Sequence, residues 1–166
     1  MDVILRRRSI RKYAKADVAE QDIRLILQAA MSAPSAGNQQ PWHFIVTRER
    51  KTLDAVTDVH PHSSMIKEAP LAIFVCADLN AEKHKGYWVQ DCSACTQNIL
   101  LAVESLGLGA VWLGVYPRED RVKGIKKLLN LPEHIMPFSV IPIGHSAEKP
   151  DNIDRFDQKR IHQNSW

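Results

Sequence analysis

The 166-residue sequence contains no long apolar run, only three cysteines and little excess charge. A membrane-spanning helix needs about 18 to 20 consecutive apolar residues, and no stretch of this chain approaches that length. The N-terminus carries arginines where a secretory signal would have its apolar stretch. We therefore expect a cytoplasmic protein whose cysteines stay reduced.

The usual side-chain patterns of metal sites and hydrolases are also missing. Cys92 and Cys95 have the two-residue spacing of zinc and dithiol sites, but no second pair of this kind exists. Their spacing fits two small packing residues within a helix. His60 and His62 fall in a loop where His62 can face a ligand, and no histidine accompanies a recognisable nucleophile. We expect no metal site.

Apolar residues are abundant enough to form a folded core. Hydrophobic residues make up 45% of the chain and charged residues 25%, which is ordinary for a globular protein. No internal repeat, low-complexity tract or linker divides the sequence. We expect one domain over residues 1–166.

Segments whose apolar residues have helical spacing alternate along this domain with segments typical of strands. Asp17 and Glu20 have the spacing of a capping-box variant before the first strong helical pattern. The pattern predicts helices at about 18–33, around 53–56, and at 86–107 and 118–129. It predicts strands at 43–47, 71–77, 110–115 and 137–144. The strand at 71–77 is apolar throughout and should be central, whereas the tail after Gly144 has no clear period. The order of elements indicates an α+β fold.

Positive charge is concentrated near the N-terminus, although the net charge is only +3. The first fifteen positions contain Arg6, Arg7, Arg8, Arg11, Lys12 and Lys15. Arginine presents a planar fork of donors suited to phosphate, and the Ser9 hydroxyl lies among these residues. Taken alone, the segment fits a solvated basic arm better than a binding site. A nucleic-acid-binding arm is a weaker alternative, because the chain has no second basic stripe and no aromatic platform motif.

Two further segments suit a planar ligand. Residues 34–42 are rich in turn formers, hydroxyls and amides, and such groups can pair with a heterocycle that carries both donors and acceptors. Residues 107–114 place glycines on both sides of a short strand, where Gly114 allows a backbone N–H to approach a ligand closely. Both segments also fit ordinary connections. The glycine spacing does not match the dinucleotide-binding fingerprint.

Together these three segments resemble the nitroreductase family of flavoenzymes. The resemblance is carried by residues 7–13, 33–42, 107–109 and 112–114 and spans nearly the whole chain, and residues 33–42 are its most diagnostic part. It implies an α+β fold with a central, mostly antiparallel sheet flanked by helices. It also implies an intertwined homodimer, with FMN at the interface and a C-terminal tail that wraps the partner.

The resemblance assigns roles to particular residues. The phosphate and ribityl end of FMN would be bound by Arg7, Arg8, Ser9 and Arg11. The loop that reaches the flavin from the partner subunit would contribute Pro34, Ser35, Asn38 and Gln40. The segment beside the isoalloxazine ring would be Trp112, Leu113 and Gly114. A basic C-terminal residue would close on the phosphate, with Arg155 the better match and Lys149 the competing one.

The activity implied by this resemblance is flavin-mediated reduction. NADH or NADPH would donate a hydride to FMN, which would pass it to a small electron-poor acceptor such as a nitroaromatic or a quinone. No catalytic side chain is expected, because the chemistry belongs to the flavin. The chain is short and lacks the helical insertion that covers the active site in longer members. A flavin-binding or flavin-handling protein with little turnover is the alternative.

Overall fold

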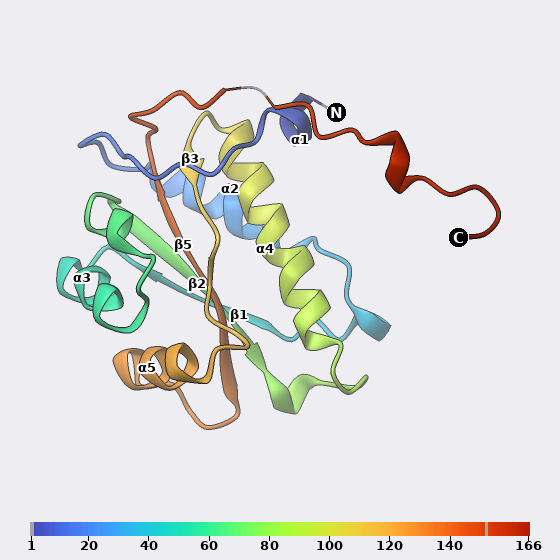
Figure 1. Ribbon diagram of the computed structural model, residues 1–166. Coiled ribbons are helices and arrows are strands. Elements are labelled where there is room, and N and C mark those ends of the chain that lie inside the picture. Colours follow the sequence, from blue (N-terminus) through green and yellow to red (C-terminus); the bar gives the residue numbers. More distant parts are fainter. Residues whose placement is uncertain (1, 152) are drawn as a thin grey trace.

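The computed structural model describes residues 2–151 and 153–166 and shows an antiparallel sheet covered by helices on both faces (Figure 1). In these residues the strand order is β1-β2-β5-β3, and β4 also pairs with β5. The strands are β1 (Trp42–Thr47), β2 (Leu71–Asp78), β3 (Gly109–Ala110), β4 (Leu113–Gly114) and β5 (Ile135–Gly144). Every strand pair is antiparallel, which confirms the predicted α+β fold with a mostly antiparallel sheet.

The helices divide between the two faces of the sheet. On one face α2 (Glu20–Met31) and α4 (Trp88–Ser105) pack together over a core, and on the other α3 (Arg50–Val59) and α5 (Glu119–Leu129) cover a second one. A short helix, α1 (Asp2–Arg6), lies against α4. The two cores are separated only by the sheet, so a strand between them has to be apolar on both sides.

Strand β2 occupies that position. Leu71, Ile73 and Val75 belong to the core beneath α2 and α4, while Ala72 and Phe74 belong to the core beneath α3 and α5. Alternate residues of a strand point to opposite faces, so a strand with two covered faces is apolar at every position. The prediction of a buried central strand at 71–77 is therefore confirmed.

Two local predictions were wrong, and one short helix was missed. Asp17 does not cap a helix: the N-cap of α2 is Ala19, without a side-chain hydrogen bond, and the Asp17 carboxylate lies 3.9 Å from Arg48. The strand expected at 110–115 is two short strands, because Val111 and Trp112 lie outside the ladder. The helix α1 was not predicted, since five residues are too few to show a helical period.

All three cysteines are buried and free. Burial raises the pKa of Cys76 and of Cys95 to about 12, so both remain neutral thiols near neutral pH. No group of three or more His, Cys, Asp or Glu side chains in the described part of the chain is placed to hold a metal ion. Among those same residues no helix is long and apolar enough to cross a membrane.

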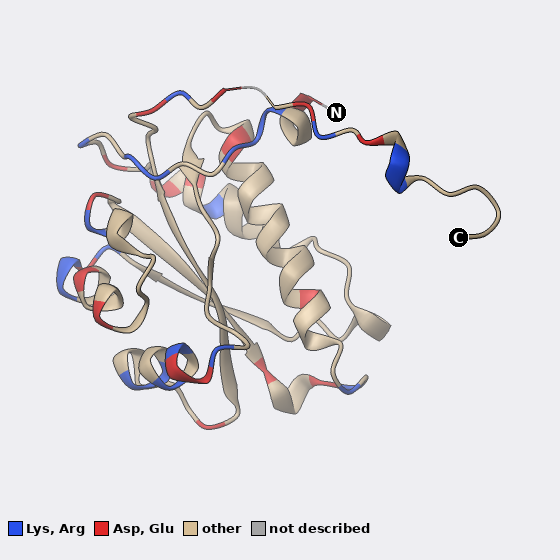
Figure 2. Cartoon of the chain, in the orientation of Figure 1, with Lys and Arg blue, Asp and Glu red and all other residues tan. Residues whose placement is uncertain are grey.

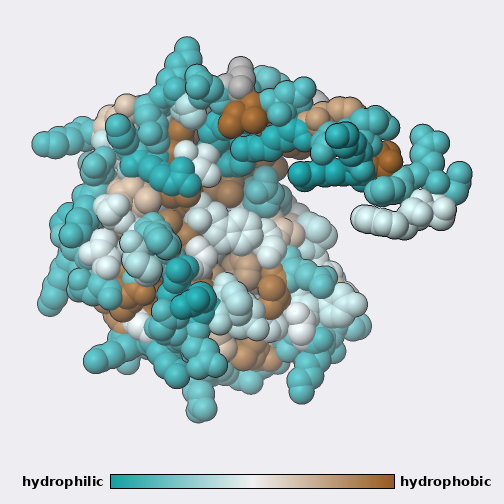
Figure 3. All heavy atoms as spheres, viewed as in Figure 1, coloured by the Kyte–Doolittle hydropathy of each residue, from teal (hydrophilic) through white to brown (hydrophobic). Residues whose placement is uncertain are grey.

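The C-terminal tail runs over the surface and then leaves the body of the molecule (Figures 1 and 3). From Asp151 onward its described residues are exposed and form only a short 3-10 turn at Gln158–Arg160. Large apolar side chains of the tail are nevertheless exposed, with Phe156 at 72% and Trp166 at 100%. Such side chains, spaced along one segment, are typical of a surface that docks onto another.

Candidate functional site

The basic N-terminal segment lies along the edge of the sheet. Its Ile10 N–H donates to the Ala110 carbonyl at 2.9 Å, and Ser9 forms a parallel bridge with the same residue of β3. A side chain at Gly109 would come within 2.7 Å of Ile10, so the glycine permits this close approach. The sequence motif around Ser9 is therefore held beside the segment that contains Gly107, Gly109 and Gly114.

Two of the predicted arginines meet a third from the tail. Burial, and then the neighbouring charges of Arg155 and Arg8, lower the pKa of Arg7 from its ordinary value. Within residues 2–151 and 153–166, none of these three forms an ion pair. Figure 2 shows the run of basic residues along this segment. The Glu104 carboxylate acts on Arg7 more weakly than the two arginines do, so the cluster keeps a net positive charge, which fits a phosphate.

Arg8 and Arg11 differ in how they are held. The Arg8 guanidinium donates to the backbone carbonyls of Leu5 at 2.7 Å and Asp151 at 3.0 Å, so it ties the tail to the N-terminal segment. The Arg11 backbone N–H donates to the Glu148 carboxylate at 2.5 Å, whereas its side chain is exposed.

The tail supplies Arg155 and leaves Lys149 exposed elsewhere. Lys149 is not among the charges that act on Arg7, whereas Arg155 acts on it more strongly than Arg8 does. A cavity of about 770 Å³ between α1 and the tail is lined by Arg6, Arg8 and Arg155. The structure thus groups Arg155, rather than Lys149, with the N-terminal arginines.

The segment from Trp112 to Gly114 borders open space on the α4 side of the sheet. Leu113 packs into the core beneath α3 and α5, so its neighbours Trp112 and Gly114 face the opposite way. Trp112 is half-buried against Phe138, with ring centroids 5.7 Å apart. No atom lies within 4 Å of the point that a Gly114 Cβ would occupy. This space can accept a planar group against the backbone.

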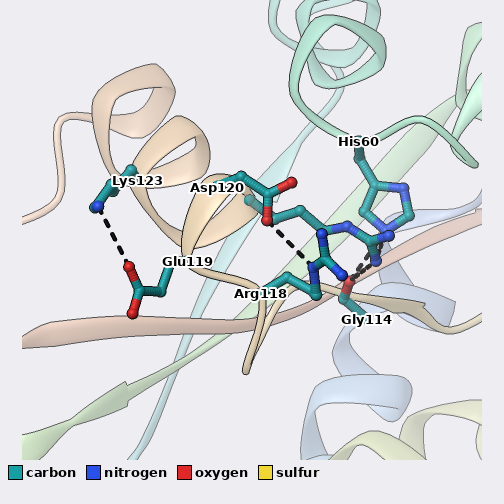
Figure 4. A network of polar contacts seen from close by, with 7 residues as sticks. His60, Gly114, Arg118, Glu119, Asp120 and Lys123 are labelled. Carbon is teal, nitrogen blue, oxygen red and sulfur yellow. Dashed lines mark hydrogen bonds and ion pairs between the residues drawn. The ribbon is translucent and has the colours of Figure 1, made fainter.

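The backbone amide of Gly114 points away from the sheet. The Val115 N–H donates to the Phe138 carbonyl of β5 at 3.0 Å, and hydrogen-bonding direction alternates along an antiparallel strand. The N–H and C=O of Gly114 therefore both face outward. Its carbonyl accepts from Arg121 Nη1 at 2.8 Å and contacts His60 Nε2 at 3.0 Å (Figure 4).

His60 and Arg121 were not predicted as site residues. His60 is only 3% exposed, and burial followed by the charge of Arg121 lowers the pKa of this imidazole. The His62 N–H lies 3.3 Å from His60 Nδ1, which places the proton of the neutral ring on Nε2, facing Gly114. Sequence reasoning assigned His60 to a ligand-mouth loop but had no signal for its burial.

The loop of residues 34–41 is folded on itself. The Gln40 backbone N–H donates to Ser35 Oγ at 3.0 Å, and the Gln40 amide donates to Asn38 Oδ1 at 2.6 Å. Gly37 has a φ of 53° and packs under the His84 ring, where a Cβ would come within 2.3 Å of that ring. Any other residue would need the exposed His84 ring to move aside.

A buried carboxylate clamps this loop to α4. Asp91 is 4% exposed and accepts from the Ala36 backbone N–H at 2.9 Å and from the Gln39 side chain at 2.5 Å. Gln39 Oε1 in turn accepts from the backbone N–H groups of Lys83 at 2.8 Å and His84 at 3.0 Å. Sequence reasoning missed both Asp91 and Gln39. The available signal was one acidic residue in the first turn of an otherwise apolar helix.

The loop and the arginines lie toward opposite ends of α4. Arg6, at the start of the basic segment, pairs with Glu104 at 3.6 Å, whereas the loop is bound to Asp91. At 1.5 Å per residue these two positions are about 20 Å apart along the helix. Within one chain, the structure groups Arg7, Arg8 and Arg155 and does not bring Ser35 or Asn38 to them.

Comparison with known proteins identifies the family. Residues 4–145 match the model of the Nitroreductase family. A Methanothermobacter thermautotrophicus protein, provisionally named NADH dehydrogenase/NAD(P)H nitroreductase, is 57% identical over 166 residues, covering 100% of this chain and 87% of its own length.

Solved structures support the same family. A Parabacteroides distasonis protein with the same provisional name has a TM-score of 0.96 at 43% identity, covering 99% of this chain and 97% of that one. An FMN-dependent nitroreductase from Clostridium difficile has a TM-score of 0.92 at 31% identity, and each chain is covered in full, at 100%. Because the family model spans most of the chain and the fold agrees throughout, this protein belongs to the Nitroreductase family.

Proposed function

We propose that residues 1–166 form one FMN-binding domain of a cytoplasmic NAD(P)H-dependent oxidoreductase. Its acceptor would be a small electron-poor molecule such as a nitroaromatic or a quinone. The observation that carries this proposal is the place of the N-terminal segment that contains Arg7: its Ile10 binds Ala110, four residues before the open space at Gly114, and the charge of Arg155 acts on Arg7. Relatives named as NAD(P)H nitroreductase and as FMN-dependent nitroreductase support it.

The chemistry of the residues fits FMN. FMN has a phosphate at one end and a ring at the other. The chain places arginines near Ser9 and an open space beside Gly114, and these match the two ends of the cofactor. From Ala110, beside Ser9, to Gly114 the segment spans four residues, or roughly 13 Å at 3.3 Å per residue. Arg7, Ser9, Arg11 and Arg155 would hold the phosphate and ribityl chain. Trp112, Gly114 and the backbone of Leu113 would line the ring.

When bound, FMN supplies a ring that accepts a hydride from a reduced nicotinamide and passes reducing equivalents onward. The chain's own residues bind and orient. The Gly114 N–H faces outward beside the ring site, and Trp112 packs against Phe138 and helps to shield that site from water. All three cysteines are buried, and Cys76 and Cys95 remain neutral thiols, so these residues supply no exposed thiolate nucleophile.

We further propose a homodimer in which each site is completed by the loop at 34–41 of the partner subunit. The loop and the arginines of one chain lie about 20 Å apart along α4. A second copy running antiparallel along α4 would bring its own loop toward Arg7. The exposed apolar side chains of the tail, including Phe156 and Trp166, would then wrap that copy.

The purified protein is expected to be yellow, with FMN close to one per chain. Anaerobic mixing with NADH or NADPH should bleach the flavin absorbance, because an open strip beside Gly114 allows a nicotinamide to approach the ring. Stopped-flow absorbance measures this step. Bound flavin that neither nucleotide bleaches would support a flavin-handling protein with little turnover, and a colourless protein that cannot be loaded with FMN would contradict the proposal.

Subunit mixing tests where the loop acts. Arg7→Ala and Asn38→Asp are each expected to weaken FMN binding, and aspartate tolerates the left-handed φ of 53° at position 38. In a purified heterodimer of the two variants, an interface site would pair the intact arginine of one chain with the intact loop of the other. One of the two sites should then bind FMN as the wild type does. Two weakened sites would show that arginine and loop act within one chain.

A further inference from the structure

The backbone segment that faces the proposed ring is poorly supported by the sheet. Strands β3 and β4 contribute two residues each to the ladder, and Val111 and Trp112 between them lie outside it. Gly114, at the end of this segment, has no side chain to anchor it. Its position therefore depends also on contacts outside the sheet.

Such a contact exists at the Gly114 carbonyl. Two donors converge on this oxygen: Arg121 Nη1 at 2.8 Å and His60 Nε2 at 3.0 Å (Figure 4). The two nitrogen atoms are 3.1 Å apart, which fits their sharing one acceptor. Arg121 Nε is also buried, with no hydrogen-bond partner in the described residues. A buried guanidinium N–H without a hydrogen-bond partner costs free energy. Packing around Arg121 must therefore hold this side chain in place.

Helix packing on the far side of the sheet brings these donors together. Any side chain at Gly124 would come within 2.5 Å of Val59, so glycine allows α5 to approach the end of α3 closely. His60 follows Val59 directly, and Arg121 lies three residues before Gly124 on the same helix. This approach directs both side chains to the same backbone oxygen.

We propose that Arg121 and His60 are positioning residues that aim the Gly114 N–H at the flavin ring. In an extended strand the N–H and C=O of a residue leave the backbone on the same side, so anchoring the carbonyl fixes the direction of the N–H. The inference rests on the proposed FMN function. It extends that function to two residues on the opposite face of the sheet, which do not touch the cofactor.

The first test needs no cofactor. Arg121→Gln is expected to accelerate hydrogen exchange of the 109–116 backbone by about fivefold in the FMN-free protein, as the loss of one hydrogen bond would allow. Arg118→Gln is the matched control, because Arg118 lies at the start of the same helix and its exposed side chain pairs with Asp120 at 3.3 Å rather than with Gly114. Equal exchange in the two variants would overturn the anchor.

The second test uses the FMN-loaded protein. Arg121→Gln is expected to shift the visible absorbance of the bound flavin and to lower its rate of reduction at saturating NAD(P)H about tenfold, as misplacement of an orienting group does. FMN affinity should change far less, because Arg7 and Arg155 are untouched. Arg121→Lys keeps a cationic donor and should recover part of the rate.

The outcomes separate this inference from the proposed function. If the wild type binds no FMN, or its flavin is not reduced, the proposed function fails. If the wild type is reduced but Arg121→Gln has the spectrum and rate of Arg118→Gln, only the positioning role fails. Should Arg121→Gln not fold, Gly124→Ala replaces it, since a Cβ there would push α5 from Val59 and should have the same spectral effect. An unchanged spectrum in a folded Gly124→Ala would overturn the role.

Discussion

Replacing Arg7 by alanine is expected to weaken FMN binding roughly tenfold to a hundredfold, because a phosphate loses a charge-assisted donor worth about 1.5 to 3 kcal/mol. Arg7 is partly withdrawn from water beside Arg155 and Arg8 and has no ion pair in the described chain. Glu104 acts on Arg7 more weakly than either of these arginines, and a bound phosphate would supply further negative charge. Titration of the FMN-free protein, followed by flavin fluorescence, measures the change.

The same variant should discriminate between two ligands that differ only in the phosphate. Riboflavin has the ring and ribityl chain of FMN, so its affinity should be almost unaffected by Arg7→Ala. Arg11→Ala is expected to behave similarly, since the Arg11 side chain is exposed and only its backbone N–H is bound to Glu148. Arg24→Ala, an exposed arginine on α2, serves as the control. Unchanged FMN affinity in both the Arg7 and the Arg11 variant would place the phosphate elsewhere.

Replacing Asp91 by alanine is expected to lower the free energy of unfolding by about 3 kcal/mol or more, because two hydrogen bonds to a buried carboxylate are lost. The Ala36 N–H and the Gln39 amide would both be left buried without this acceptor. Urea unfolding of the FMN-free protein measures the loss. For a chain of this size, the melting temperature should fall by roughly 6 to 12 °C.

A matched control separates the loss of the buried Asp91 clamp from the effect of removing any acidic residue in the first turn of a helix. Glu119, in the first turn of α5, is exposed and pairs with Lys123 at 3.4 Å. Glu119→Ala should cost less than about 1 kcal/mol, as exposed ion pairs do. Asp91→Asn should lie between the two, since its one carbonyl oxygen can accept from either Ala36 or Gln39 and its amide opposes the other. An Asp91→Ala variant as stable as Glu119→Ala would show that the loop does not depend on the clamp.

FMN binding should depend on the same Asp91 clamp. The loop at 34–41 is proposed to complete the partner's site, so loosening it in Asp91→Ala should release FMN even though Arg7 is intact. Riboflavin should be released to a similar degree, because the loop would contact the ring end of the cofactor. The pattern differs from that of Arg7→Ala, in which only the phosphate-bearing ligand is affected.

Local patterns were enough to predict most of the secondary structure. The helical periods at 86–107 and 118–129 became α4 and α5, and the apolar run at 71–77 became β2. These predictions succeeded because the spacing of apolar residues within a short stretch of sequence indicates which side chains are buried. The capping box at Asp17 was wrong because a short motif is satisfied as easily by an ion pair, here with Arg48.

The candidate site was predictable only where it consists of contiguous motifs. Arg7, Ser9, the loop at 34–41 and Gly114 all belong to segments whose composition suits a phosphate or a heterocycle. Asp91 and Arg121 belong to helices in which nothing local distinguishes them. Their partners, Gln39 and Gly114, are reached only after the helices have packed on the sheet.

The sequence by itself therefore determined the α+β class, the order of the elements and the motifs that mark the Nitroreductase family. Together with two other segments, the basic arm resembles that family, and on this ground we propose that it is a phosphate site and not a solvated arm. The tertiary structure decided which basic residue of the tail lies near the N-terminal arginines, since Arg155 lines the same cavity as Arg6 and Arg8 and its charge acts on Arg7. It also decided that the loop and the arginines of one chain lie toward opposite ends of α4. These contacts join residues that are far apart in the chain. Helix packing brings such residues together, and it leaves no periodic pattern in the local sequence from which the contacts could be predicted.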